Sequence, residues 1–125
     1  MHLQNRTRAP GDLGAAGVEF ALVLPILVLF LGGMIDFGLA FHNQIGLTHA
    51  AREGVRVEAI GSGDGVATSL ATFTPVAVND LEATVVRDCP SDDGAMVRIE
   101  ATYDFFILPI GDLTLRGEAV MRCFG

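Results

Sequence analysis

Residues 20–35 read FALVLPILVLFLGGMI, a run without a charged or strongly polar side chain. If the helix around it extends from residue 18 to residue 41, a rise of about 1.5 Å per residue gives roughly 36 Å, enough to cross a hydrocarbon core of about 30 Å. A cleavable secretory signal is the competing interpretation, but its apolar part is only about 7–15 residues long and ends at a small-residue site. The run here is longer and continues into His42-Asn43-Gln44 without such a site. It predicts a single membrane-spanning helix.

The flanks of this segment predict its orientation. Residues 1–14 are polar and carry Arg6 and Arg8 against a single acid, Asp12. Positively charged flanks stay on the cytoplasmic side of a membrane. We therefore expect a cytoplasmic N-terminus and a C-terminal domain on the outer side of the membrane.

Two acids and one proline interrupt the apolar segment. Asp36 lies near the outer interface, where we expect water to solvate it. Glu19 lies four residues after the Gly14–Ala15 junction, and an acid within a membrane segment is a candidate for a specific partner. Pro25 removes one backbone hydrogen bond from the helix, so we expect a local bend there.

Three motifs surround this helix. Residues 14–25 read GAAGVEFALVLP, residues 36–38 read DFG, and residues 50–56 read AAREGVR. Together they resemble the TadE-like pseudopilin family, which belongs to the tight-adherence (Flp) branch of type IV pilus systems. The resemblance covers residues 14–56, and it implies a pilin-like fold and a role in pilus assembly and cell adhesion rather than catalysis.

The resemblance also implies roles for individual residues. A prepilin peptidase would cleave after Gly14 at the cytoplasmic face and leave Ala15 as the new N-terminus, so that residues 1–14 form a leader peptide. Glu19, followed by Phe20, would act in subunit assembly, because the Glu19 carboxylate of one subunit would pair with the Ala15 ammonium of a neighbour. The alternative is that Glu19 lies among lipid headgroups as an N-terminal helix residue favoured by the helix dipole.

The partners implied by the resemblance are the prepilin peptidase, other pilins or pseudopilins, the inner-membrane assembly platform and the lipid bilayer. The resemblance also implies that the chain lies in the bacterial inner membrane, with a C-terminal domain that is periplasmic or extracellular. A major pilin of the same branch is one competing interpretation, but such subunits are little more than the helix. The other is an unrelated single-pass protein with a binding or adhesive domain. The sequence leaves open whether the subunit enters the pilus or only primes its assembly.

Beyond Asp36 the helical pattern continues to about residue 60 as an amphipathic stalk, so that residues 15–60 form one helical unit. Its predicted apolar side carries Phe37, Phe41, Leu47, Ala51 and Val55, and its polar side carries His42, His49, Glu53 and Arg56. Residues 61–80 are predicted as a linker that opens with GSGDG, contains a possible short helix at residues 66–73, and is interrupted by Pro75.

Residues 81–125 show the alternation of apolar and polar side chains that is typical of strands with one buried face. The clearest example is residues 97–105, where Val97, Ile99 and Ala101 alternate with polar side chains. Residues 90–94, PSDDG, are a turn signature. We predict an α+β fold in which a three-stranded antiparallel sheet packs on the stalk helix.

Cys89 and Cys123 both lie in this C-terminal part, at the same end of the predicted sheet. The first and third strands of such a sheet are about 9–10 Å apart, whereas a disulfide needs Cα atoms within about 7 Å. Cys89 must therefore lean over the end of the second strand, which its place in a turn allows. We predict a disulfide, with two buried free thiols as the alternative.

Composition excludes several other functions. The chain has 125 residues, with 15 Asp and Glu against 8 Arg and no Lys, and binding to nucleic acid needs clustered cations. No catalytic constellation is apparent, and the C-terminal domain is too small to enclose much of a substrate. His42 and His49 share a helix face but have no third ligand, so neither a metal nor another cofactor is predicted.

Overall fold

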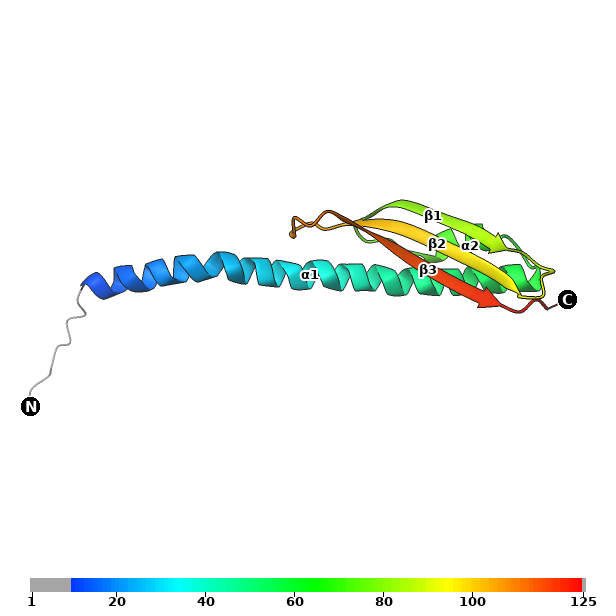
Figure 1. Ribbon diagram of the computed structural model, residues 1–125, viewed down its shortest axis with the longest axis horizontal. Helices are drawn as coiled ribbons and strands as arrows, with labels where there is room; N and C mark the ends of the chain where they lie inside the picture. Colours follow the sequence, from blue (N-terminus) through cyan, green and yellow to red (C-terminus); the bar gives the residue numbers. More distant parts are fainter. Residues whose placement is uncertain (1–9, 125) are drawn as a thin grey trace, which may run out of the picture.

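The computed structural model describes residues 10–124 and the side chains from residue 14 onward. The elements follow the order α1 (Pro10–Ile60), α2 (Gly65–Thr72), β1 (Val78–Arg87), β2 (Ala95–Asp104) and β3 (Asp112–Met121). The sheet and α2 lie along the C-terminal half of α1, whereas the N-terminal half extends alone (Figure 1). Most of the predicted leader, residues 1–9, lies outside the described residues. The predicted α+β architecture is confirmed.

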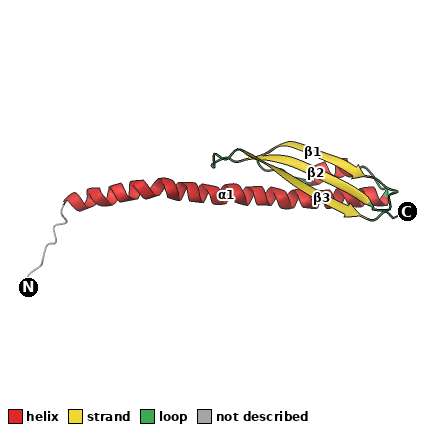
Figure 2. Cartoon of the chain, viewed as in Figure 1, coloured by secondary structure: helices red, strands yellow, loops and turns green. Residues whose placement is uncertain are grey.

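Helix α1 has 51 residues and continues through Pro25. It curves gently and shows no sharp kink along its length (Figure 2). Residues 14–31 are all exposed, and the helix contains an 18-residue window with a mean hydropathy of 2.4. This helix is long and apolar enough to cross a membrane, and its free half fits a single-pass membrane anchor.

The three strands form an antiparallel sheet in the order β1-β2-β3, as the alternation predicts. Every second residue of β2 from Ala95 to Tyr103 is buried, so one face of the sheet packs on α1. The opposite face carries cross-strand ion pairs, Arg98–Glu118 at 2.6 Å and Arg116–Glu100 at 2.5 Å. In each pair the two residues are direct partners in the β2–β3 register. Their side chains are partly exposed, so each ion pair adds little stability.

The core lies between the C-terminal half of α1 and the buried face of the sheet. Leu47, Ala50 and Ala51 of α1 pack with residues such as Ile99 and Tyr103 of β2. Strand β3 crosses α1 very closely at Gly117, where a Cβ would overlap the backbone of Leu47. A side chain at residue 117 would therefore force the sheet away from the helix.

The predicted apolar side of the stalk is partly wrong. Leu47, Ala51 and Val55 are buried as expected, but Phe37 is 47% exposed and Phe41 is 68% exposed. The buried stripe in this part of α1 consists of Gly32, Asp36, Ala40 and Asn43 instead. Small and polar residues face the domain here because close packing favours them, and the larger apolar side chains face outward.

The segment predicted as a linker folds onto α1. Asp64 caps the N-terminus of α2 by accepting hydrogen bonds from the backbone N–H groups of Val66 and Ala67, at 2.8 and 3.1 Å. After α2, the buried amide of Asn43 donates to the carbonyl of Val76 at 2.7 Å and accepts from its N–H at 3.1 Å. Strand β1 then begins at Val78, earlier than the alternation predicts.

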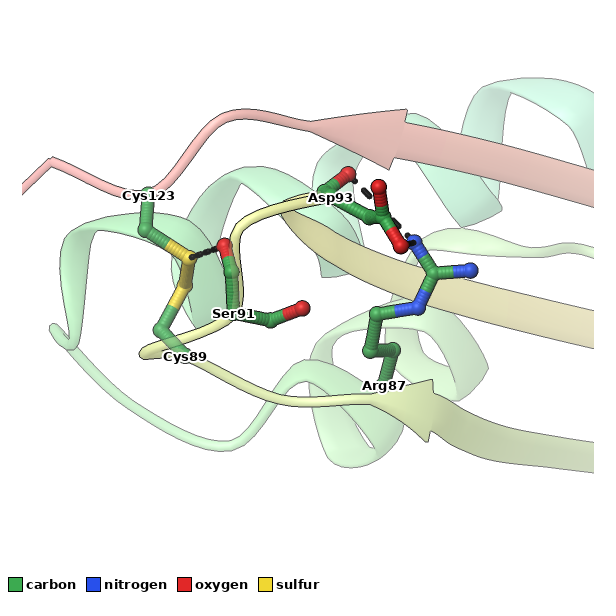
Figure 3. The surroundings of a disulfide bond; sticks show 5 residues. All are labelled: Arg87, Cys89, Ser91, Asp93 and Cys123. Atoms are coloured by element: carbon green, nitrogen blue, oxygen red, sulfur yellow. Dashed lines mark hydrogen bonds and ion pairs between the residues drawn. A yellow bond between two sulfur atoms is a disulfide. The ribbon is translucent and has the colours of Figure 1, made fainter.

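Cys89 and Cys123 form a disulfide, with their Cα atoms 5.8 Å apart. Cys89 lies just beyond β1 and Cys123 just beyond β3, so the bond spans the end of β2 as the strand spacing requires (Figure 3). Arg87 and Asp93 form an ion pair at 3.8 Å beside it. The predicted pairing geometry is confirmed, and the end of the sheet far from the free half of α1 is covalently closed.

Candidate functional site

The residues predicted for processing and assembly all lie on the free half of α1. Gly14, Ala15, Glu19 and Phe20 are exposed, and Phe20 is 64% exposed. Ala15 and Glu19 are four residues apart, so they lie on the same side of the helix. Among the side chains that the structure describes, none forms an ion pair or hydrogen bond with Glu19. The role of Glu19 in assembly stays a prediction.

A second acid, Asp36, lies at the junction between the free half of α1 and the folded domain. Its side chain is 0% exposed, so the prediction that water solvates it is wrong. Its carboxylate accepts three backbone hydrogen bonds, from the N–H groups of Phe106, Ile107 and Leu108 at 3.2, 2.9 and 2.9 Å.

We call the segment of residues 105–110, with the sequence FFILPI, the hairpin tip. It extends past the sheet toward the free half of α1 and overhangs the helix (Figure 1). Ile107 lies so close to Gly32 that a Cβ there would overlap its side chain, and Leu108 lies next to Gly33. Gly111 ends the tip with a φ of 92°, a conformation that glycine adopts without strain.

An aromatic cluster connects the hairpin tip to the core. The ring of Phe105 packs edge-on against Phe37 of α1 at 5.6 Å between centroids, and against Tyr103 of β2 at 5.3 Å. The buried hydroxyl of Tyr103 has no partner in hydrogen-bonding geometry, although the carboxylate of Asp36 is near enough to act on it. Burial, followed by the negative charge of Asp36, raises the pKa of Tyr103 above its ordinary value of 10.0.

This raised pKa predicts a loss of stability at high pH. The native state holds the phenolic proton more tightly than the unfolded state. The contribution of Tyr103 to stability is therefore fully present below about pH 10 and is lost as the pH rises through the folded-state pKa. We expect Tyr103→Phe to leave the melting temperature nearly unchanged at pH 7, because the hydroxyl has no acceptor to lose. At pH 11 the variant should melt at a higher temperature than the wild type.

Two measurements check this expectation. The chain has a single tyrosine, so its absorbance change on ionisation reports Tyr103 directly and should occur above pH 10. Thermal unfolding at pH 9 and pH 11 gives the stability difference. Ionisation at the ordinary pKa, with equal alkaline sensitivity in both proteins, would contradict the assignment.

The third motif, AAREGVR at residues 50–56, acts as a packing surface. Ala50, Ala51, Gly54 and Val55 are buried, whereas Arg52, Glu53 and Arg56 are exposed. A Cβ at Gly54 would overlap the hydroxyl of Ser69 in α2. This motif therefore holds α2 and the sheet against α1, and it is distant from the processing and assembly residues.

The motif at residues 36–38 also has a structural explanation, which the sequence did not indicate. Asp36 holds the hairpin tip and Phe37 contacts Phe105. A signal was present, namely an acid in an apolar helix and a distant apolar loop, but nothing local connects the two. Within the described part of the chain, no group of three or more His, Cys, Asp or Glu side chains is placed to hold a metal ion.

Comparison with known proteins agrees with the three motifs. Residues 14–56 match the model of a family described as TadE-like protein. Neither the curated proteins nor the solved structures include a match to the chain. The matched segment begins at Gly14, contains Glu19 and Asp36, and ends at Arg56, the last residue of the packing motif. The predicted resemblance is thereby confirmed: residues 14–56 of this chain are similar to the TadE-like family.

Proposed function

We propose that this chain is a membrane-anchored pseudopilin, a minor subunit that acts in the assembly of a tight-adherence type IV pilus. The observation that carries the proposal is the exposed apolar half of α1, which begins at Gly14 within the TadE-like segment and presents Glu19 one turn beyond Ala15. A helix of this kind serves first as a membrane anchor and later as a packing surface for neighbouring subunits.

The folded part favours a minor subunit over a major pilin. Beyond the helix the chain has α2, three strands and a disulfide, so it carries a folded domain in addition to the helix. Within this proposal residues 1–14 form the leader, residues 15–60 the helical unit, and residues 81–125 the outer domain. The prepilin peptidase, other pilins and the assembly platform are its partners, and its N-terminus is cytoplasmic.

Processing at Gly14 tests the proposal. A Cβ added at Gly14 meets nothing within 4 Å, so Gly14→Leu leaves the fold intact. We expect this variant to accumulate as unprocessed precursor and to stop pilus assembly, whereas the wild-type mature protein begins at Ala15. Mass spectrometry and N-terminal sequencing of membrane fractions distinguish the two forms.

Gly17→Leu is the matched control, because a Cβ at Gly17 also meets nothing within 4 Å and an apolar residue fits that position of the motif. It should be processed normally. A Gly14→Leu protein of normal mature mass would argue for the alternative, an unrelated membrane-anchored binding or adhesive domain.

A further inference from the structure

The hairpin tip exposes apolar side chains at the end of the domain that overhangs the free half of α1 (Figure 1). Phe106 is 89% exposed, Ile110 is 59% exposed and Ile107 is 37% exposed. Charged residues resume only at Asp104 and Asp112, on either side of the tip. A contiguous apolar patch of this kind usually marks a binding surface.

The position of the tip along α1 places it at membrane depth. A span of about 20 residues that begins at residue 18 ends near Phe37. The tip contacts Gly32, which then lies about 7–8 Å inside that boundary at 1.5 Å per residue. Leu108 also borders an apolar groove lined by Leu29, Phe30, Gly33, Met34 and Phe37, so the lipid-facing surface of the helix continues onto the tip.

The backbone N–H groups of the tip are hydrogen-bonded within the protein. Phe105 donates its N–H to the carbonyl of Gly111 at 3.3 Å, and Ile110 donates to that of Leu108 at 2.9 Å. The three N–H groups between them bind Asp36, and Pro109 has none. Every backbone N–H of residues 105–110 therefore has a partner within the protein.

Pairing of every N–H group is unnecessary for a loop in water, where solvent accepts from free N–H groups. In hydrocarbon each unpaired group costs several kcal/mol, so non-helical backbone is found at that depth only where protein satisfies it. Asp36 takes the place of water for this loop. Its own charge is compensated by three N–H donors, which is how a buried carboxylate is tolerated.

We infer that the hairpin tip inserts into the outer half of the bilayer beside α1 and binds lipid acyl chains, as a second membrane contact of the same subunit. The inference rests on the membrane span in the proposed function. With two contacts, the helix and the tip, the domain has a fixed tilt and a fixed rotation relative to the membrane plane. Depth-dependent fluorescence quenching in vesicles tests it.

Single cysteines are introduced at exposed apolar positions of the full chain and labelled with an environment-sensitive fluorophore under oxidising conditions. Cys89 and Cys123 are paired and do not react. Phe106→Cys and Ile110→Cys report the tip, Phe30→Cys reports the span, and Val120→Cys is the matched control in the domain. Phe30 and Val120 are 66% and 59% exposed, and Val120 is near the far end of β3 (Figure 1).

The labelled proteins are reconstituted in phosphatidylcholine vesicles that contain lipids with a nitroxide on the acyl chain. We expect strong loss of fluorescence at residues 30, 106 and 110, and little loss at residue 120. Quenching at residue 30 with residue 106 unquenched, like residue 120, would overturn the inference and leave the membrane span intact.

An unquenched label at residue 30 would overturn the span itself, and the proposed function with it. Lowering the protein-to-lipid ratio of the vesicles tests the alternative that a second copy of the chain, and not lipid, covers the tip. If acyl-chain quenching at residue 106 does not depend on dilution, lipid binds the tip. If quenching appears only on dilution, a neighbouring subunit covers the tip and the inference fails.

Discussion

Replacing Asp36 with alanine is expected to release the hairpin tip from α1 and to lower the melting temperature of the domain by about 10 °C or more, since a stability loss of 1 kcal/mol shifts a domain of this size by several degrees. Three backbone N–H groups lose a charged acceptor at once, and hydrogen bonds to charged groups are the stronger kind. The contacts of Ile107 and Leu108 with Gly32 and Gly33 depend on the same anchoring. Thermal unfolding in detergent, followed by the circular dichroism of the sheet, measures the effect.

Two further variants distinguish the loss of the hydrogen bonds to Asp36 from the general effect of removing a negative charge from α1. Asp36→Asn keeps one oxygen acceptor and loses the charge, so it should fall between alanine and the wild type. Glu53→Ala removes an exposed acid of the same helix, whose contact with Arg56 is 4.0 Å, and should be nearly neutral. Hydrogen exchange at residues 106–108 should accelerate in Asp36→Ala alone. An unchanged melting temperature in that variant would refute the role assigned to Asp36.

Replacing Glu19 with glutamine or alanine is expected to abolish subunit association while the monomer still inserts into the membrane. Removing an acid from an apolar segment makes insertion as favourable or more so. In the assembled state, however, the Ala15 ammonium of the neighbouring subunit would lose its counter-charge, which we expect to weaken association by about a hundredfold or more. Blotting for the mature form and co-purification of partner pilins measure the two steps separately.

Leader cleavage should be largely unaffected in these Glu19 variants, because the Gly14–Ala15 bond lies several residues away. Glu53→Gln, a change of an exposed acid in the domain part of α1, is the matched control and should assemble normally. If Glu19→Ala is cleaved, inserted and assembled at wild-type levels, Glu19 serves only as a headgroup-facing residue.

Much of the fold was predictable because its signals are local. The apolar run of residues 20–35 indicates a membrane helix by composition, and the alternation in β2 indicates a sheet with one buried face. The disulfide was predictable as well, since the parity and spacing of Cys89 and Cys123 place them at one end of the strands. Each of these inferences needs only a short stretch of chain and a known repeat.

The Asp36 site was not predictable in the same way. Its three donors lie 70 to 72 residues away in the sequence, and no periodicity relates the two segments. The prediction of which side of α1 faces the domain is wrong for a related reason. Amphipathic logic buries large apolar residues such as Phe37 and Phe41, but in a membrane-facing helix those residues face outward, and Gly32, Asp36 and Ala40 face the protein.

The continuity of α1 has a mechanical consequence. Helix α1 runs unbroken from Pro10 to Ile60, so no joint separates Glu19 from the residues that hold the sheet. Within the proposed function, a rotation of the membrane end about the helix axis would therefore turn the domain with it, and the direction in which the domain points relative to Glu19 would be set by the count of residues between Glu19 and Asp36. Because each residue turns an α-helix by about 100°, a single insertion between them would rotate the whole domain to another side of its neighbours.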